Sequence, residues 1–93
     1  GPVIINDYAH IGENCRIHVG VNIGGSINEP KKAPIIGNNV YIGPGAKIYG
    51  NIKIGDNVAI GANAVVNKDV PNNVTVAGVP AKIVSNKGNI RKL

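Results

Sequence analysis

The sequence predicts an all-β chain folded as a parallel β-helix, a solenoid of short strands joined by sharp corners. The first observation is a six-residue period over residues 36–70, where an aliphatic side chain returns and a second apolar residue follows four positions later. The second is that this spacing fits neither an amphipathic helix nor an alternating strand. The third is the regular return of Gly and Asn, which tolerate the backbone of tight turns. Each unit therefore supplies two inward side chains and one corner.

The repeat also predicts which residues stack on one another. Three units close one triangular coil, and successive coils stack at about 4.8 Å through parallel strand pairing. Extending the repeat toward the N-terminus gives three columns: Ile5, Ile23, Ile48 and Val66; Ile11, Ile36 and Ile54; and Ile17, Ile42 and Ile60. The residues that follow the third column then form one corner of the coil, where an extended ligand could contact the backbone. This corner consists of His18, Gly43 and Gly61, with Val19, Pro44 and Ala62 beside them.

Two interruptions divide the chain. Ile23 and Ile36 lie thirteen residues apart instead of six, which predicts a loop protruding at about 25–34. A polar, proline-containing insertion on a regular scaffold is a common place for function. After Val70 the repeat fades, and one more strand and a tight turn follow near Val74–Val76. We therefore expect a β-helix domain over 1–84, the C-terminal catalytic part of a longer protein, and a basic tail over 85–93.

Composition narrows the class of protein. The 93 residues include thirteen Gly and no Phe, Trp or Met, which suits a narrow interior of Ile, Val and Ala. No long apolar run or signal-like start is present, and Cys15 is the only cysteine, so the sequence predicts a cytoplasmic protein without a membrane span. Cys15 falls at an inward, small-residue position. The net charge is +5, but no aromatic residues alternate with the basic ones, which argues against nucleic-acid binding.

A family resemblance follows from these motifs. The hexapeptide repeat, together with the ending Ala77-Gly78-Val79-Pro80-Ala81-Lys82, resembles the left-handed parallel β-helix acyltransferases over almost the whole chain. The runs over residues 17–25 and 42–52 are most similar to serine O-acetyltransferase and the polysaccharide O-acetyltransferases. Left-handedness comes from this resemblance alone, because crossovers between parallel strands are ordinarily right-handed.

The resemblance implies transfer of an acetyl group from the cosubstrate acetyl-CoA to a hydroxyl of serine or a sugar. It also implies a His general base and a homotrimer whose active sites lie between subunits. The cosubstrate would lie along the corner that contains His18, with Lys82 beside the CoA phosphates. The groups that hold it would lie near Gly25, Ser26, Gly43, Pro44, Gly61 and Ala62.

The catalytic base is where this sequence departs from the family. In the serine acetyltransferases the principal His lies a few residues before the position that matches Pro2, and a second His falls where this chain has Ala33. Only His10 and His18 are present. His10 falls at a variable position, where an exposed surface side chain is expected. His18 lies on the ligand corner and is therefore the candidate base.

Two points remain open from the sequence: the function class and the acceptor. The chain could be an inactive β-helix scaffold that trimerises and holds CoA without turnover. A zinc site, as in the γ-class carbonic anhydrases of similar repeat pattern, needs three His, and two are present, so no metal is expected. The acceptor also stays open, because the change to Ala33 weakens the assignment to serine and makes a saccharide more plausible.

Overall fold

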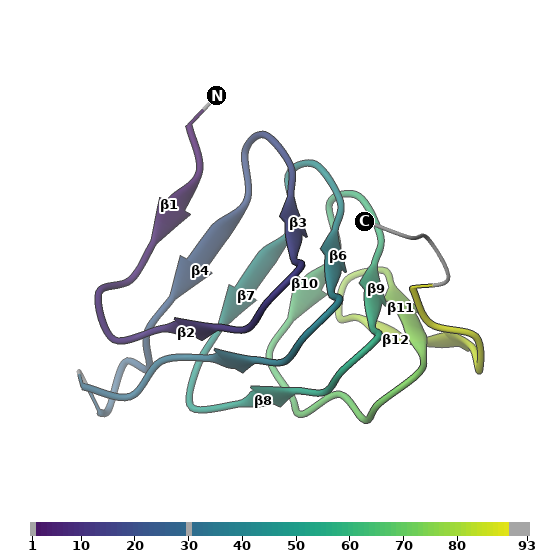
Figure 1. Ribbon diagram of the computed structural model, residues 1–93. Coiled ribbons are helices and arrows are strands. Elements are labelled where there is room, and N and C mark those ends of the chain that lie inside the picture. The colour runs from purple at the N-terminus through teal and green to yellow at the C-terminus, as the bar shows by residue number, and fades with distance from the viewer. Residues whose placement is uncertain (1, 30, 90–93) are drawn as a thin grey trace.

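The structure is a computed structural model that describes residues 2–29 and 31–89. Its short strands wind into a coil of triangular cross-section (Figure 1), and within the described residues no helix could cross a membrane. The strands are β1 (Ile4–Ile5), β2 (His10–Ile11), β3 (Arg16–Ile17), β4 (Asn22–Gly24), β5 (Ile35–Ile36), β6 (Tyr41–Ile42), β7 (Lys47–Tyr49), β8 (Lys53–Ile54), β9 (Ala59–Ile60), β10 (Val65–Val66), β11 (Thr75–Ala77) and β12 (Lys82–Ser85).

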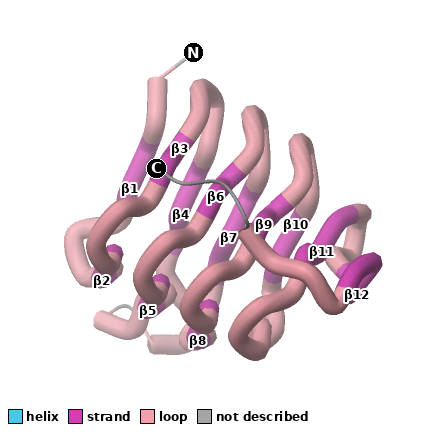
Figure 2. Tube along the Cα trace, turned by 45° about the vertical axis from the view of Figure 1, so that its right-hand side comes forward, coloured by secondary structure: helices cyan, strands magenta, loops and turns pink. Residues whose placement is uncertain are grey.

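Three sheets form the sides of the triangle, and the chain visits them in turn. Sheet A has the order β1-β4-β7-β10, sheet B has β2-β5-β8, and sheet C has β12-β11-β9-β6-β3. The tube in Figure 2 shows the successive coils stacked side by side. Every pairing is parallel except that between β11 and β12. Each strand is only two to four residues long because a corner follows at once.

The strand register confirms all three predicted columns. In sheet A, Ile5 pairs with Ile23, Ile23 with Ile48, and Ile48 with Val66. Sheet B aligns the second column. In sheet C, Ile17 pairs with Ile42 and Ile42 with Ile60. The insertion between β4 and β5 therefore leaves the order of the faces unchanged.

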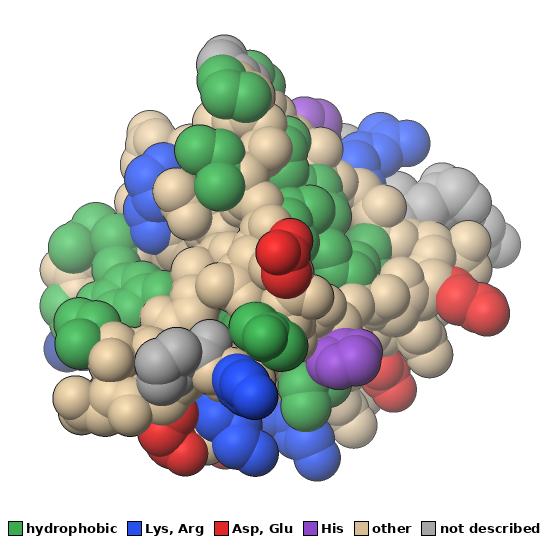
Figure 3. All heavy atoms as spheres, turned by 90° about the vertical axis from the view of Figure 1, so that its left-hand side faces the viewer, with side chains coloured by type: hydrophobic (Ala, Val, Ile, Leu, Met, Phe, Trp, Pro, Cys, Tyr) green, Lys and Arg blue, Asp and Glu red, His purple; other side chains and the backbone are tan. Residues whose placement is uncertain are grey.

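The core lies inside the triangle and consists of the two repeating series of apolar residues. All six aliphatic residues of the first series over 36–66 are buried, and Ile52 of the second series is only half-buried. The first coil is less covered: Ile5 is 41% exposed and Ile11 is half-buried. Figure 3 looks onto this N-terminal end, where apolar side chains gather near the centre.

Asparagines build the corner between sheets B and C, which we call the asparagine corner (residues 12–14, 37–39, 55–57 and 71–73). Asn14, Asn39, Asn57 and Asn73 all have positive φ, between 56° and 63°, a conformation that Asn tolerates better than most residues. The Asn39 Nδ2 donates to Asn57 Oδ1 at 3.1 Å, and Asn57 Nδ2 donates to Asn73 Oδ1 at 3.0 Å. These side chains therefore connect successive coils outside the strands.

Two details differ from the expected boundaries. The predicted loop lies between β4 and β5, but its last residue belongs to the coil: Pro34 is fully buried, and its carbonyl accepts a hydrogen bond from His10 N at 3.1 Å. Pro34 takes the second-series position that Ala9 and Ile52 take in the adjacent coils. The sequence also predicted one strand after Val70, whereas β11 and β12 form an antiparallel hairpin there. The six-residue period carries no signal for a strand that reverses direction.

Candidate functional site

The predicted ligand corner lies between sheets C and A, and we call it the His18 corner (residues 18–20, 43–45, 61–63 and 77–78). Because Ile17, Ile42 and Ile60 are in register, the next residues of each coil are neighbours in one row. Backbone hydrogen bonds fix this row: His18 N donates to Ile42 O at 3.2 Å, and Gly43 N donates to Ile60 O at 2.8 Å. The structure therefore brings together His18, Gly43 and Gly61, as the sequence predicts.

Pro44 and Ala62 form a second row on this corner, and both side chains are exposed. The Pro44 carbonyl accepts from Asn63 N at 2.9 Å, which joins the two coils at this point. Pro44 and Ala62 are thus available to a molecule that lies along the corner.

Stacking of the coils explains the glycines of the His18 corner. A Cβ on Gly43 would lie 2.7 Å from the nitrogen of Ala62 in the next coil, which is too close. A Cβ on Gly61 would lie 3.2 Å from the Cβ of Ala77. The packing of the scaffold alone therefore requires a small residue here, and the glycines are not by themselves a sign of a ligand.

The hairpin adds Lys82 to the same corner. Ala77 follows Val76, which pairs with Ile60, so Ala77 lies next to Gly61 in the row, and Lys82 pairs with Ala77 across the hairpin. The row therefore begins at His18 and ends at Lys82, five residues at roughly 4.8 Å per step. The Lys82 side chain is exposed and provides a positive charge at the C-terminal end of the corner.

A second cation on this corner was not among the predicted site residues. The Lys47 Nζ donates to Gly20 O at 3.0 Å and to Gly45 O at 3.1 Å, so it bridges two successive coils. The repeat predicts only that Lys47 faces outward from sheet A. Its contact with the corner depends on the path of the side chain, for which the sequence has no signal.

Gly25 and Ser26 lie elsewhere, on the corner between sheets A and B. Gly24 pairs with Tyr49 at the end of sheet A, and the chain turns away from the His18 corner at that point. Ser26 N donates to Lys32 O at 2.9 Å, which closes the inserted loop. A hollow of about 330 Å³ lies at this corner, lined by Ser26, Ile27, Tyr49, Gly50, Asn51, Ile52 and Asn67. Within one chain, sheet A separates these residues from the His18 corner.

The His18 side chain is partly buried and packs on an aromatic ring. Its ring centroid lies 5.0 Å from that of Tyr41, with 59° between the planes. The Nε2 atom is buried and has no hydrogen-bond partner in the described part of the chain. In this conformation Nε2 is therefore shielded from a molecule at the corner.

The other candidate residues have structural surroundings. His10 is exposed in β2, as expected for a surface side chain. The Cys15 Sγ is partly buried and donates to Gly37 O at 3.2 Å, which fits the predicted inward position. Over residues 2–29 and 31–89, no three His, Cys, Asp or Glu side chains come together in a way that could hold a metal ion.

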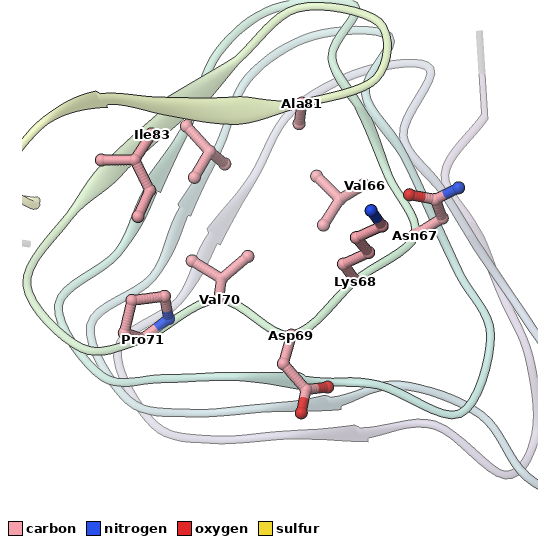
Figure 4. A pocket seen from close by; sticks show the side chains of 9 residues that line it. Val66, Asn67, Lys68, Asp69, Val70, Pro71, Ala81 and Ile83 are labelled. Atoms are coloured by element: carbon pink, nitrogen blue, oxygen red, sulfur yellow. The ribbon is translucent and has the colours of Figure 1, made fainter.

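A smaller cavity of about 140 Å³ lies at the C-terminal end of the coil (Figure 4). Its walls include the core residues Val66, Val70 and Val76. Figure 4 shows Ala81 and Ile83 of the hairpin segment on the side opposite Val70 and Asp69. Lys68 and Asp69 also line it. This cavity contains none of the predicted site residues.

Comparison with known proteins finds similarity to hexapeptide-repeat transferases and to serine acetyltransferases. Residues 33–68 match the family described as bacterial transferase hexapeptide (six repeats). The chain is 45% identical over 87 residues to the serine acetyltransferase of Synechococcus elongatus, an alignment that covers 92% of this chain and 36% of that protein. The chain thus spans little more than a third of the length of this curated relative.

Solved structures agree with the sequence matches. The serine acetyltransferase of Brucella abortus superposes with a TM-score of 0.86 at 44% identity, covering 92% of this chain and 35% of that one. A serine acetyltransferase in complex with CoA superposes with a TM-score of 0.81 at 41% identity, covering 88% and 33%. The expected left-handed parallel β-helix is therefore confirmed as the fold.

Proposed function

We propose a function from the premise that the chain belongs to the bacterial transferase hexapeptide family and is similar to serine acetyltransferases. The chain would be the β-helix part of an O-acetyltransferase that moves an acetyl group from acetyl-CoA to a hydroxyl of serine or a sugar. The observation that carries this proposal is the row from His18 to Lys82, which is long enough for an extended ligand. A solved structure that is similar to this chain is a serine acetyltransferase in complex with CoA.

The His18 corner suits an extended cosubstrate. Exposed Pro44 and Ala62 would contact the pantetheine arm from successive coils, with the backbone at Gly43 and Gly61 beside them. Lys82 would hold the CoA phosphates at the C-terminal end, because an ammonium group is a good partner for a phosphate. The acyl end would then lie near His18, at the opposite end of the row.

In the reaction, the acceptor hydroxyl oxygen attacks the thioester carbonyl carbon and the carbon–sulfur bond breaks. A general base takes the hydroxyl proton, which finally reaches the CoA thiolate. His18 is the candidate base and would act through Nδ1, since Nε2 is buried.

We further propose that two copies complete each site. Gly25 and Ser26 lie on the corner between sheets A and B, whereas the remaining predicted residues lie on the His18 corner. One ligand can contact both groups only if a neighbouring copy supplies one of them. A homotrimer with a cyclic, head-to-tail arrangement would repeat this contact three times. The cytoplasmic location stays a prediction.

Mixing of two variants tests the shared site. Ala62→Trp would obstruct the His18 corner, and Ser26→Trp would obstruct the other corner, so we expect each variant alone to lose acetyl-CoA binding. When the two are unfolded together and refolded at equal amounts, roughly a quarter of the interfaces of a cyclic assembly should combine two intact halves. Binding measured by calorimetry should recover to about that fraction. Absence of any recovery in correctly folded mixtures would contradict a site shared between copies.

A second pair of variants tests the chemistry. We expect His18→Ala to lower the rate of CoA thiol release by about 10²- to 10⁴-fold, the usual contribution of a general base. His10→Ala is the control, because His10 is exposed on sheet B and should leave the rate unchanged. Full activity of His18→Ala would remove His18 from the mechanism.

The scaffold remains a second candidate function, and the buried Nε2 of His18 favours it. A side chain with its Nε2 buried could line the site without taking part in catalysis. Complete absence of acetyl-CoA binding by the unmodified chain would support the scaffold, whereas thiol release that depends on an acceptor would exclude it.

A further inference from the structure

The segment after β12 returns along the outside of the coil. We call residues 86–89 the latch. The Thr75 Oγ1 donates to Lys87 O at 2.6 Å, and Lys87 N donates to Ser85 Oγ at 3.0 Å. Asn89 N then donates to Asn57 O at 2.9 Å, and Asn89 Nδ2 donates to Asn39 O at 2.9 Å. The latch therefore contacts three successive coils along the asparagine corner.

The latch fits this corner closely. A Cβ added to Gly88 would overlap the carbonyl oxygen of Asn57 and would lie 3.0 Å from the carbonyl carbon of Asn73. Gly88 and Asn89 are partly buried, whereas Asn86 and Lys87 are exposed. Contact with the backbone of the coils, and not burial of apolar side chains, determines where the latch lies.

β12 needs such an attachment because little burial holds it. Lys82, Ile83 and Val84 are all exposed, and Ile83 and Val84 are 51% and 63% accessible. The strand is the last of sheet C and pairs only with β11. At its start, Ala81 N donates to Val65 O at 2.8 Å, and at its end the latch begins. Without the latch, β12 would be held only by its pairing with β11 and by the hydrogen bond of Ala81 at its start.

We propose that the latch is a positioning device, in which Asn89 and Thr75 hold β12 in place and so fix Lys82 at the end of the His18 corner. The part of this proposal that concerns Lys82 and acetyl-CoA depends on the proposed function. Neither Asn89 nor Thr75 touches the cosubstrate, and both act through the backbone of β12.

Hydrogen exchange on the full chain tests whether the latch holds β12 in place. In Asn89→Ala and Thr75→Val, we expect the amides of residues 82–85 to exchange about tenfold faster, because each substitution removes a hydrogen bond of ordinary strength. Amides of β4 and β7, in sheet A and away from the asparagine corner, should exchange at the original rate. Asn86→Ala is the control, since Asn86 is exposed and outside these contacts. Unchanged exchange of residues 82–85 in both variants would overturn the proposal.

Steady-state kinetics test the connection to Lys82. We expect Asn89→Ala to raise the KM for acetyl-CoA several-fold and to leave kcat and the KM for the acceptor nearly unchanged. Faster exchange with an unaltered KM for acetyl-CoA would overturn the positioning of Lys82 while the proposed function stands. Failure of the unmodified chain to bind acetyl-CoA would overturn the proposed function, and the exchange experiment would still decide whether the latch holds β12.

Discussion

Ile42→Ala should lower the free energy of unfolding by about 2–5 kcal/mol, the usual cost of truncating a fully buried Ile. Ile42 has no exposed surface and lies between Ile17 and Ile60 in the third column, in the middle of the stack. Adjacent coils cannot collapse into the cavity, because the backbone hydrogen bonds of sheet C keep them apart. A loss of this size is a large fraction of the 5–15 kcal/mol that stabilises a typical domain.

Urea denaturation at one fixed protein concentration measures this loss, since assembly would make stability depend on concentration. Ile35→Ala is the matched control: Ile35 lies in β5 with 46% of its surface exposed, so its truncation should cost much less. Equal losses for the two variants would contradict the assignment of Ile42 to the core.

Gly43→Ala should cost about 1–3 kcal/mol, as expected when an atom is forced into a closely packed region. The added Cβ would lie 2.7 Å from the nitrogen and 3.0 Å from the Cα of Ala62. Both are backbone atoms, so no side chain can move aside. The hydrogen bond from Gly43 N to Ile60 O, at 2.8 Å, would have to lengthen to make room.

Gly24→Ala provides the comparison for this prediction. A Cβ on Gly24 would lie 3.6 Å from the Cβ of Tyr49, an ordinary contact, so we expect a change of less than about 1 kcal/mol. Thermal unfolding of both variants followed by circular dichroism measures the difference. A Gly43→Ala protein as stable as Gly24→Ala would show that the coils can separate at the His18 corner at little cost.

The architecture could be predicted from spacing because one interior position recurs in every unit. A residue such as Ile48 must face inward when its neighbours six residues away do, and the same spacing aligned His18 with Gly43 and Gly61. The antiparallel direction of β12 could not be predicted, since it occurs once and outside the repeat. The place of Pro34 was missed for a related reason: a proline beside a loop has the same sequence signal whether it lies inside or outside the coil.

The site was harder to predict than the fold. Stacking gave the correct neighbours along one corner, but Gly25 and Ser26 were assigned to that corner on resemblance alone. In a triangular coil each corner belongs to a different pair of sheets, so these residues lie across sheet A from His18. A resemblance in sequence does not indicate whether one copy or two copies of the chain contribute these residues to a site.

The sequence by itself determined the period, the three columns of the core and the row that begins at His18, because these follow from regular spacing and short-range turn preferences. Only the tertiary structure decided three further points: Nε2 of His18 is buried, Lys47 reaches the carbonyls of two coils, and the latch lies on the asparagine corner. Each depends on where a side chain or a non-repeating segment meets distant backbone. Spacing along the chain contains no information about such contacts.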